Sequence, residues 1–174
     1  MGDDLGYVKS TIEENWHESI DGRIQDVPKP KVYQESDPNR RRVKLNEGDV
    51  IFVKDGGTTH TEPQSFNWVE ERVDSRIDID IRSTGDGGNI NGRTRMWGVR
   101  DDDGNSERYG GLVGEVKRIF HERRRGEAGY DVISLPEIHD LSGEMGARVW
   151  RTSIFVSLSI RAQTIDPSPT LDGN

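Results

Sequence analysis

The chain of 174 residues contains no cysteine and only four histidines. The lack of cysteine excludes disulfide bonds and thiolate metal sites, and it leaves the redox compartment open. No two histidines are spaced as metal ligands, so we expect neither a bound metal ion nor another cofactor. The histidines are His17, His60, His121 and His139.

Hydrophobic residues make up only 30% of the chain. No apolar run approaches the roughly 20 residues that a membrane-spanning helix needs. The first residues carry acids instead of the basic and then apolar pattern of a signal peptide. A chain this polar remains disordered unless its apolar residues are grouped. Here they fall into separate periodic runs, and the length suits one folded domain over residues 1–165.

Lysine is also scarce, because it contributes six of the 24 basic residues, against 32 acidic residues and a net charge of -8. This composition resembles that of proteins from salt-loving archaea. At molar salt the Debye length falls to about 3 Å, so repulsion among carboxylates costs little while their hydration keeps the protein soluble. An ordinary acidic protein from a low-salt organism is the alternative interpretation.

Two segments have the periodicity of amphipathic helices. Over residues 4–20 and 109–125, apolar residues recur at steps of three and four, which predicts one apolar stripe on each helix. The first stripe consists of Leu5, Val8, Ile12, Trp16 and Ile20, and the second of Leu112, Val113, Val116, Ile119 and Phe120.

Short apolar runs predict strands between the helices. Residues 31–34 and 49–54 have this character, and residues 55–64 are expected to form a polar loop. A longer strand is expected to begin within residues 66–73 and to continue to Thr84. In it Ile77, Ile79 and Ile81 alternate with charged residues, which predicts one buried face and one wet face.

The second half of the chain predicts a further pair of strands. A glycine-rich stretch over residues 85–107 lacks periodicity and is treated as an insertion, since loops of this length are usually functional or disordered. Residues 131–135 predict a short strand that Pro136 ends, and residues 147–165 a long final strand. The polar, proline-containing tail 166–174 is expected to be mobile.

The expected fold class is therefore α+β, with a mixed or antiparallel sheet and two amphipathic helices packed on one of its faces.

Motifs that carry catalytic chemistry are missing. The sequence contains no Gly-x-Ser-x-Gly nucleophile motif and no phosphate-binding Gly-Lys-Ser/Thr. The acidic run Asp101–Asp103 does not match the ligand spacing of a calcium loop. Asp78 and Asp80 lie on one strand face as a possible carboxylate pair, but a solvated strand face is the favoured interpretation. We do not expect an enzyme.

The order of elements resembles that of the tail terminator (tail completion) proteins of long-tailed viruses. The resemblance covers roughly residues 4–165 and rests on four segments, not on an invariant motif. They are the helix that carries Tyr7 to Trp16, the strand Ile77 to Ile81, the second helix from Tyr109 to Phe120, and the long strand Arg148 to Ile165. The glycine-rich stretch 85–107 is longer than is usual in that family.

The resemblance implies a structural protein without catalytic residues. Six copies would form a ring that ends the tail tube and joins it to the head-side connector or stopper protein. Viral DNA would pass through the lumen without specific binding, and no membrane would be involved. The location would be the neck or tail of the virion, after assembly in the host cytoplasm, and the acidic composition favours a haloarchaeal host.

A ring requires contacts between different patches of neighbouring copies. Arginine and aromatic residues dominate the energetics of such contacts, and they supply the candidates here. A solvated role for the basic triplets and a core position for Trp150 are the alternatives. The candidate interface residues are Arg40, Arg41, Arg42, Trp68, Trp97, Arg123, Arg124, Arg125 and Trp150.

Two other functions remain open. Another neck or tail subunit, such as a head-closure or tail-tube protein, would most often be a β-barrel or sandwich, and two amphipathic helices count against it. A halophilic enzyme or small-ligand-binding domain would need a deep pocket with convergent, perturbed titratable groups. Specific DNA binding is disfavoured by the sequence pI of about 5.1.

Overall fold

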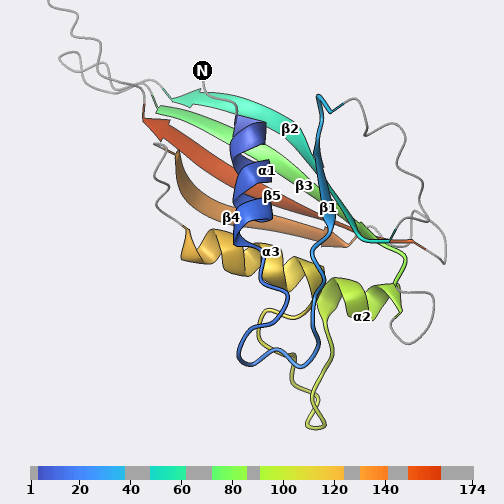
Figure 1. Ribbon diagram of the computed structural model, residues 1–174. Helices are drawn as coiled ribbons and strands as arrows, with labels where there is room; N and C mark the ends of the chain where they lie inside the picture. Colours follow the sequence, from blue (N-terminus) through green and yellow to red (C-terminus); the bar gives the residue numbers. More distant parts are fainter. Residues whose placement is uncertain are drawn as a thin grey trace, which may run out of the picture.

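The computed structural model describes residues 4–37, 48–61, 72–85, 91–123, 130–140 and 149–161. Within these ranges the helices pack against one face of a five-stranded mixed sheet (Figure 1), which confirms the expected α+β fold. In chain order the elements are α1 (Asp4–Asn15), β1 (Lys31–Gln34), β2 (Val50–Thr61), β3 (Arg72–Ser83), α2 (Gly92–Trp97), α3 (Gly111–Glu122), β4 (Tyr130–Asp140) and β5 (Trp150–Arg161).

The strands lie in the order β1-β2-β3-β5-β4. Only the four-residue β1 is parallel to its neighbour, and the other pairs are antiparallel. The register aligns Ile51 with Ile81 and Ile79 with Ile154, so apolar rows run across the face that the helices cover. Ile77, Ile79 and Ile81 are at most 1% exposed, which confirms the alternation that the sequence indicated.

The two predicted amphipathic helices are present, but both are shorter than expected. The whole apolar stripe of α3 is buried. Helix α1 buries Val8 and Ile12 and ends at Asn15, five residues early. Beyond that point Trp16 donates its indole N–H to the Val27 carbonyl at 2.9 Å. The tryptophan therefore fastens the connector to the core, which the helical spacing did not indicate.

Two strands extend through segments that the sequence assigned to other structure. β2 continues through residues 55–61, predicted as loop, because the register shifts between Asp55 and Thr58. Gly56 permits the close approach there, since a Cβ on it would lie 2.8 Å from the Arg76 carbonyl oxygen. β4 passes Pro136 because it is an edge strand with register shifts around that residue, where a missing N–H is tolerated.

The glycine-rich stretch contains a short helix, which its lack of periodicity did not indicate. Its residues 92–97 form α2, and Met96 of this helix is fully buried in the main core. Residues 66–71, 86–90 and the tail 166–174 lie outside the described residues. The predictions made for those three segments therefore stay predictions.

Candidate interaction surface: the Trp97 groove

Helix α2 is short, but it is firmly held. The Asn91 side chain caps it by accepting a hydrogen bond from the Thr94 amide at 2.9 Å. On its inner side Met96 enters the core, and the Arg95 Nε lies 3.3 Å from the Asp49 carboxylate at the start of β2. Gly92 meets the Trp150 ring so closely that a Cβ would lie 2.1 Å from it. The outer side of α2 is consequently a fixed surface.

A hairpin over residues 99–107 forms the wall opposite α2. Arg100 and Ser106 pair as an antiparallel bridge. At its base the Glu107 carboxylate accepts hydrogen bonds from the amides of Val99 at 2.9 Å and Ile24 at 2.5 Å. The Glu107 carboxylate therefore joins the two ends of the hairpin, and it also joins the hairpin to the connector between α1 and β1.

Between α2 and the hairpin lies an open groove of ≈ 850 Å³, called here the Trp97 groove. Trp97 is half-buried in its wall, while Arg93 and Arg100 are exposed. Neither guanidinium forms an ion pair or hydrogen bond with any residue of the described ranges. In a chain with a large excess of acids, two unpaired arginines beside an indole are suited to binding carboxylates. The groove is lined by Asn91, Arg93, Thr94, Trp97, Gly98, Val99, Arg100 and Ser106.

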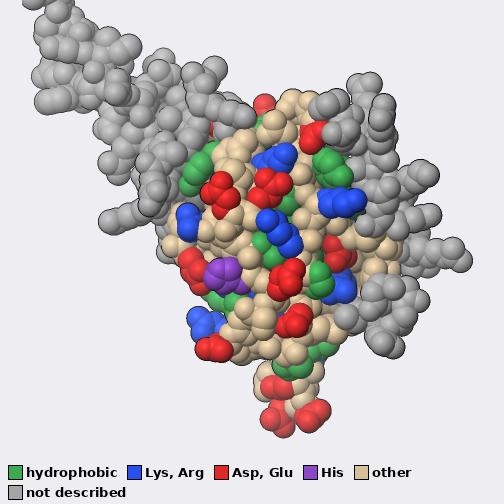
Figure 2. Space-filling model, viewed as in Figure 1, with side chains coloured by type: hydrophobic (Ala, Val, Ile, Leu, Met, Phe, Trp, Pro, Cys, Tyr) green, Lys and Arg blue, Asp and Glu red, His purple; other side chains and the backbone are tan. Residues whose placement is uncertain are grey.

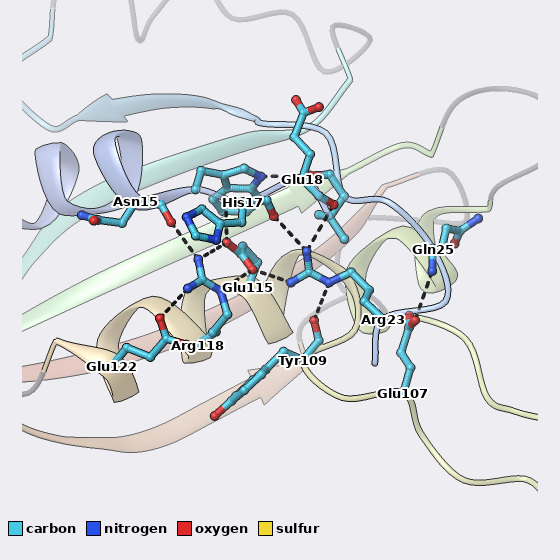
Figure 3. A network of polar contacts seen from close by, with 12 residues as sticks. Asn15, His17, Glu18, Arg23, Gln25, Glu107, Tyr109, Glu115, Arg118 and Glu122 are labelled. Carbon is cyan, nitrogen blue, oxygen red and sulfur yellow. Dashed lines mark hydrogen bonds and ion pairs between the residues drawn. The ribbon is translucent and has the colours of Figure 1, made fainter. Parts of the chain in front are cut away.

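A buried polar network holds the connector on which the hairpin rests (Figure 3). Glu115 of α3 is fully buried and accepts hydrogen bonds from Arg118, from Arg23 and from the His17 amide. Burial alone raises the pKa of Glu115, but the Arg118, His17 and Arg23 hydrogen bonds outweigh it and lower that pKa. Because Glu115 pairs with both Arg23 and Arg118, the network holds the connector against α3.

The sheet face that lacks helices carries a second charged centre. Asp80 is 0% exposed there and accepts hydrogen bonds from Lys54, Arg82 and Arg151 at 2.7–2.8 Å. Burial alone raises the pKa of Asp80, but these three cations lower it to about 2. Asp78 instead accepts a hydrogen bond from Ser153. The expected wet face is therefore wrong for Asp80, and the two aspartates have separate hydrogen-bond partners.

Arginines also cover the aromatic side chains of this open face. The Arg76 guanidinium lies 3.9 Å from the centre of the Phe155 ring, and that of Arg82 lies 5.0 Å from the Phe52 ring. Tyr33 stacks on Phe52 with 5.9 Å between ring centres. Cation–π contacts of this kind stabilise the arrangement of an exposed polar face. Arg76 and Arg82 thus have aromatic partners on their own face, whereas no such contact is found for Arg93 and Arg100 among the described residues.

The opposite, helix-covered side shows an interspersed pattern of acidic and basic side chains over α1 and α3 (Figure 2). Hydrophobic side chains appear on it only in small, separated patches. Among the described residues, no group of three or more potential ligands could hold a metal ion. No helix in that part of the chain is long and apolar enough to span a membrane.

The structure separates the candidate interface residues that the sequence proposed. Arg40, Arg41, Arg42, Trp68, Arg124 and Arg125 lie outside the described residues. Arg123 is exposed at the C-cap of α3. Trp97 and Trp150 are half-buried and pack against the core, so each has one side in the molecule and one side at the surface.

Sequence reasoning missed the remaining members of the groove. Arg93 and Arg100 lie in a glycine-rich stretch, where neither belongs to a basic triplet or a periodic stripe. The available signal was the pattern Asn-Gly-x-Thr at residues 91–94, which is compatible with a capped helix start. Once α2 is recognised, Arg93 and Trp97 fall on the same helix at a spacing of four residues.

The comparisons with known proteins leave the family open. No known protein-family profile matches the chain. No curated protein is significantly similar to it in sequence.

Proposed function

We propose that this chain is a non-enzymatic structural subunit of a virus particle, similar to a tail terminator, that assembles with its own copies into a ring. The observation that carries the proposal is the Trp97 groove. It presents an indole and two guanidiniums that have no partner among the described residues, on a surface anchored to the core. Tryptophan and arginine are the side chains most enriched at energetically important protein contacts.

The sheet edges support a ring that closes through faces and loops. β1 offers an edge of only four residues. β4 offers an edge interrupted by Pro136 and by two register shifts. Both features oppose continuous strand addition between copies. In the proposed ring, different patches on the two sides of each subunit would meet, as head-to-tail closure requires.

In this role the ring would be a hexamer at the head-proximal end of the tail tube. Its partners would be the tail tube protein and the head-side connector or stopper protein, and its location the neck of the virion. The net charge of -8 suits a channel through which DNA passes without binding, because phosphates are repelled. The low lysine content favours a haloarchaeal virus.

The alternatives receive less support. A head-closure or tail-tube subunit is usually a β-barrel or sandwich, which the packed helices α1 and α3 do not resemble. A small-ligand-binding domain would place perturbed titratable groups in its pocket. Here the carboxylates whose pKa values are lowered, Asp80 and Glu115, lie outside the groove lining.

Negative-stain electron microscopy of the purified chain in molar KCl tests the proposal. We expect closed rings of uniform diameter with a central channel. Isolated particles of single-subunit size at every protein concentration would contradict it.

A further inference from the structure

We propose that the Trp97 groove of one copy receives the acidic hairpin tip, Asp101–Asp103, of the next copy. This inference rests on the proposed ring and specifies one of its contacts. It commits to a second copy of this chain as the occupant, because the two surfaces are complementary in charge. The turn Asp101–Asp103 adjoins the groove wall but is not part of the groove lining, so the inserted and receiving surfaces differ and the contact can repeat head to tail.

Two carboxylates of the tip have no partner among the residues that the structure describes. Asp101, Asp102 and Asp103 are all exposed. Asp101 is used by the turn itself, since its carboxylate accepts a hydrogen bond from the Asn105 amide at 2.7 Å. Asp102 and Asp103 make no ion pair or hydrogen bond with the part of the chain that the structure describes. Two carboxylates are therefore held ready at the end of an ordered turn.

The hairpin projects from the body of the protein. Figure 1 shows the segment between α2 and α3 extending well beyond the helices and the sheet. Figure 2 shows acidic side chains at the end of this extension. Such a shape can enter a groove on a neighbouring molecule without a change in the core of either copy.

The groove offers the matching groups. Within the described ranges, the guanidiniums of Arg93 and Arg100 have no acidic partner, and the carboxylates of Asp102 and Asp103 have no basic one. Arginine binds carboxylates through paired hydrogen bonds, and the Trp97 ring supplies an adjacent apolar wall. Met96 anchors the α2 wall in the core, and the Glu107 carboxylate holds the hairpin wall through its hydrogen bond to Val99. Binding would therefore order few side chains, which favours affinity.

The tip of the same molecule does not fill the groove. Arg100 and Ser106 pair as a bridge on either side of the turn, and Asp101–Asp103 are not among the residues that line the groove. A nucleic acid is a less suitable occupant, because the net charge of -8 opposes the approach of phosphates. Ion pairs enclosed in a groove are screened less than exposed ones, so the contact is compatible with high salt.

A charge-swap experiment tests the contact. The mass of each variant is measured by light scattering in molar KCl, after circular dichroism has verified folding. Arg93→Glu/Arg100→Glu and, separately, Asp102→Arg/Asp103→Arg should each weaken assembly at least about tenfold, since like charges would then meet. The matched control is Lys29→Glu, which reverses an exposed lysine of the connector and should assemble as the wild type does.

Mixing the two charge-reversed variants gives the decisive result. Each variant repels copies of itself, but every contact between the two restores opposite charges. Equal amounts should therefore form oligomers of wild-type mass in which the variants alternate. The neutral pair Arg93→Gln/Arg100→Gln should show an intermediate loss, independent of any effect of new carboxylates on folding.

Three outcomes would overturn the inference. Wild-type assembly by either reversed variant would remove its surface from the contact. Failure of the mixture to assemble would show that the two surfaces do not meet. A groove variant that assembles as the wild type does, but loses an affinity for duplex DNA that the wild type has, would identify the groove as a nucleic-acid site instead. A wild-type chain that is itself monomeric would refute the ring, and it is measured first so that the two failures are distinguished.

Discussion

Asp80 and Glu115 illustrate how single side chains hold distant segments of this chain together. Each is 0% exposed, and each pairs both with a cation of its own element and with at least one cation from a distant segment. Removing one partner from a buried ion pair is strongly destabilising, because the other charge stays buried and unpaired. Both carboxylates therefore allow sharp tests.

Replacing Asp80 by asparagine should lower the free energy of unfolding by about 3–5 kcal/mol at pH 7, because three cations lose their shared counter-charge. Urea unfolding followed by circular dichroism measures the change. Asp78→Asn is the matched control on the same strand face, where the carboxylate accepts a hydrogen bond from Ser153, and it should cost about 1 kcal/mol. Equal effects of the two substitutions would contradict the role of the cations.

The pH dependence of stability follows from the same carboxylate. Its pKa is about 2 in the folded protein and 3.8 when unperturbed. A lowered folded pKa means that the stabilisation is fully present above pH 3.8 and is lost as the pH falls towards 2. The loss should amount to about 2 kcal/mol. Unfolding curves between pH 5 and pH 2 should show it in the wild type and not in Asp80→Asn; parallel curves would contradict the assignment.

Glu115→Gln should destabilise the protein by about 3–5 kcal/mol, because Arg23 and Arg118 then lack a buried counter-charge. Glu122→Gln is the control, since this 59%-exposed residue pairs with the same Arg118. A pair so exposed should contribute only about 0–1 kcal/mol. Thermal unfolding of both variants measures the difference, and similar melting temperatures would argue against the network.

Among helices and strands, periodicity correctly predicted the elements that bury a single face along their whole length. The α3 stripe and the alternation of Ile77, Ile79 and Ile81 each report one buried face, so both were predicted correctly. Boundaries set by long-range contacts were not predictable. Trp16 continues the helical spacing of α1, yet its hydrogen bond to Val27 takes it out of the helix. Pro136 ends a central strand but not an edge strand, and the sequence does not tell which one it occupies.

The groove was predictable only in part, and α2 shows why. Trp97 was identified because tryptophan is rare and favoured at interfaces, whereas the flanking arginines carried no pattern. Six residues are too few for a helical period to emerge from a glycine-rich stretch. The helix exists because Met96 and Arg95 are anchored elsewhere in the fold.

Met96→Ala should cost about 2–5 kcal/mol of stability, because a fully buried side chain would leave a cavity. Arg93→Ala on the same helix is the control and should stay within about 0.5 kcal/mol, since its side chain is exposed and has no partner among the described residues. Denaturant unfolding compares the two. A negligible effect of Met96→Ala would mean that α2 is an appendage after all.

For the protein as a whole, the acidic excess of eight charges dominates behaviour in solution. Exposed carboxylates repel one another at low salt, and screening removes that repulsion. The buried centres at Asp80 and Glu115 are affected far less. We therefore expect added salt to raise the stability of the fold by screening the surface carboxylates.

The midpoint of thermal unfolding should consequently rise as KCl increases from 0.1 M to molar concentration. The expected gain is several degrees, since about 1 kcal/mol shifts the midpoint of a domain this size by roughly 2–4 °C. Differential scanning calorimetry measures it, with sodium sulfate at equal ionic strength as the comparison. A midpoint that is equal or lower at high salt would argue against adaptation to a salt-rich cytoplasm.

The central claim is that copies of this chain assemble with one another. Multi-angle light scattering of the wild-type protein in molar KCl tests it most directly, because it yields mass without assumptions about shape. We predict one species of about six times the 19.7 kDa chain mass. A single species of 19.7 kDa that persists as the protein is concentrated would contradict the claim.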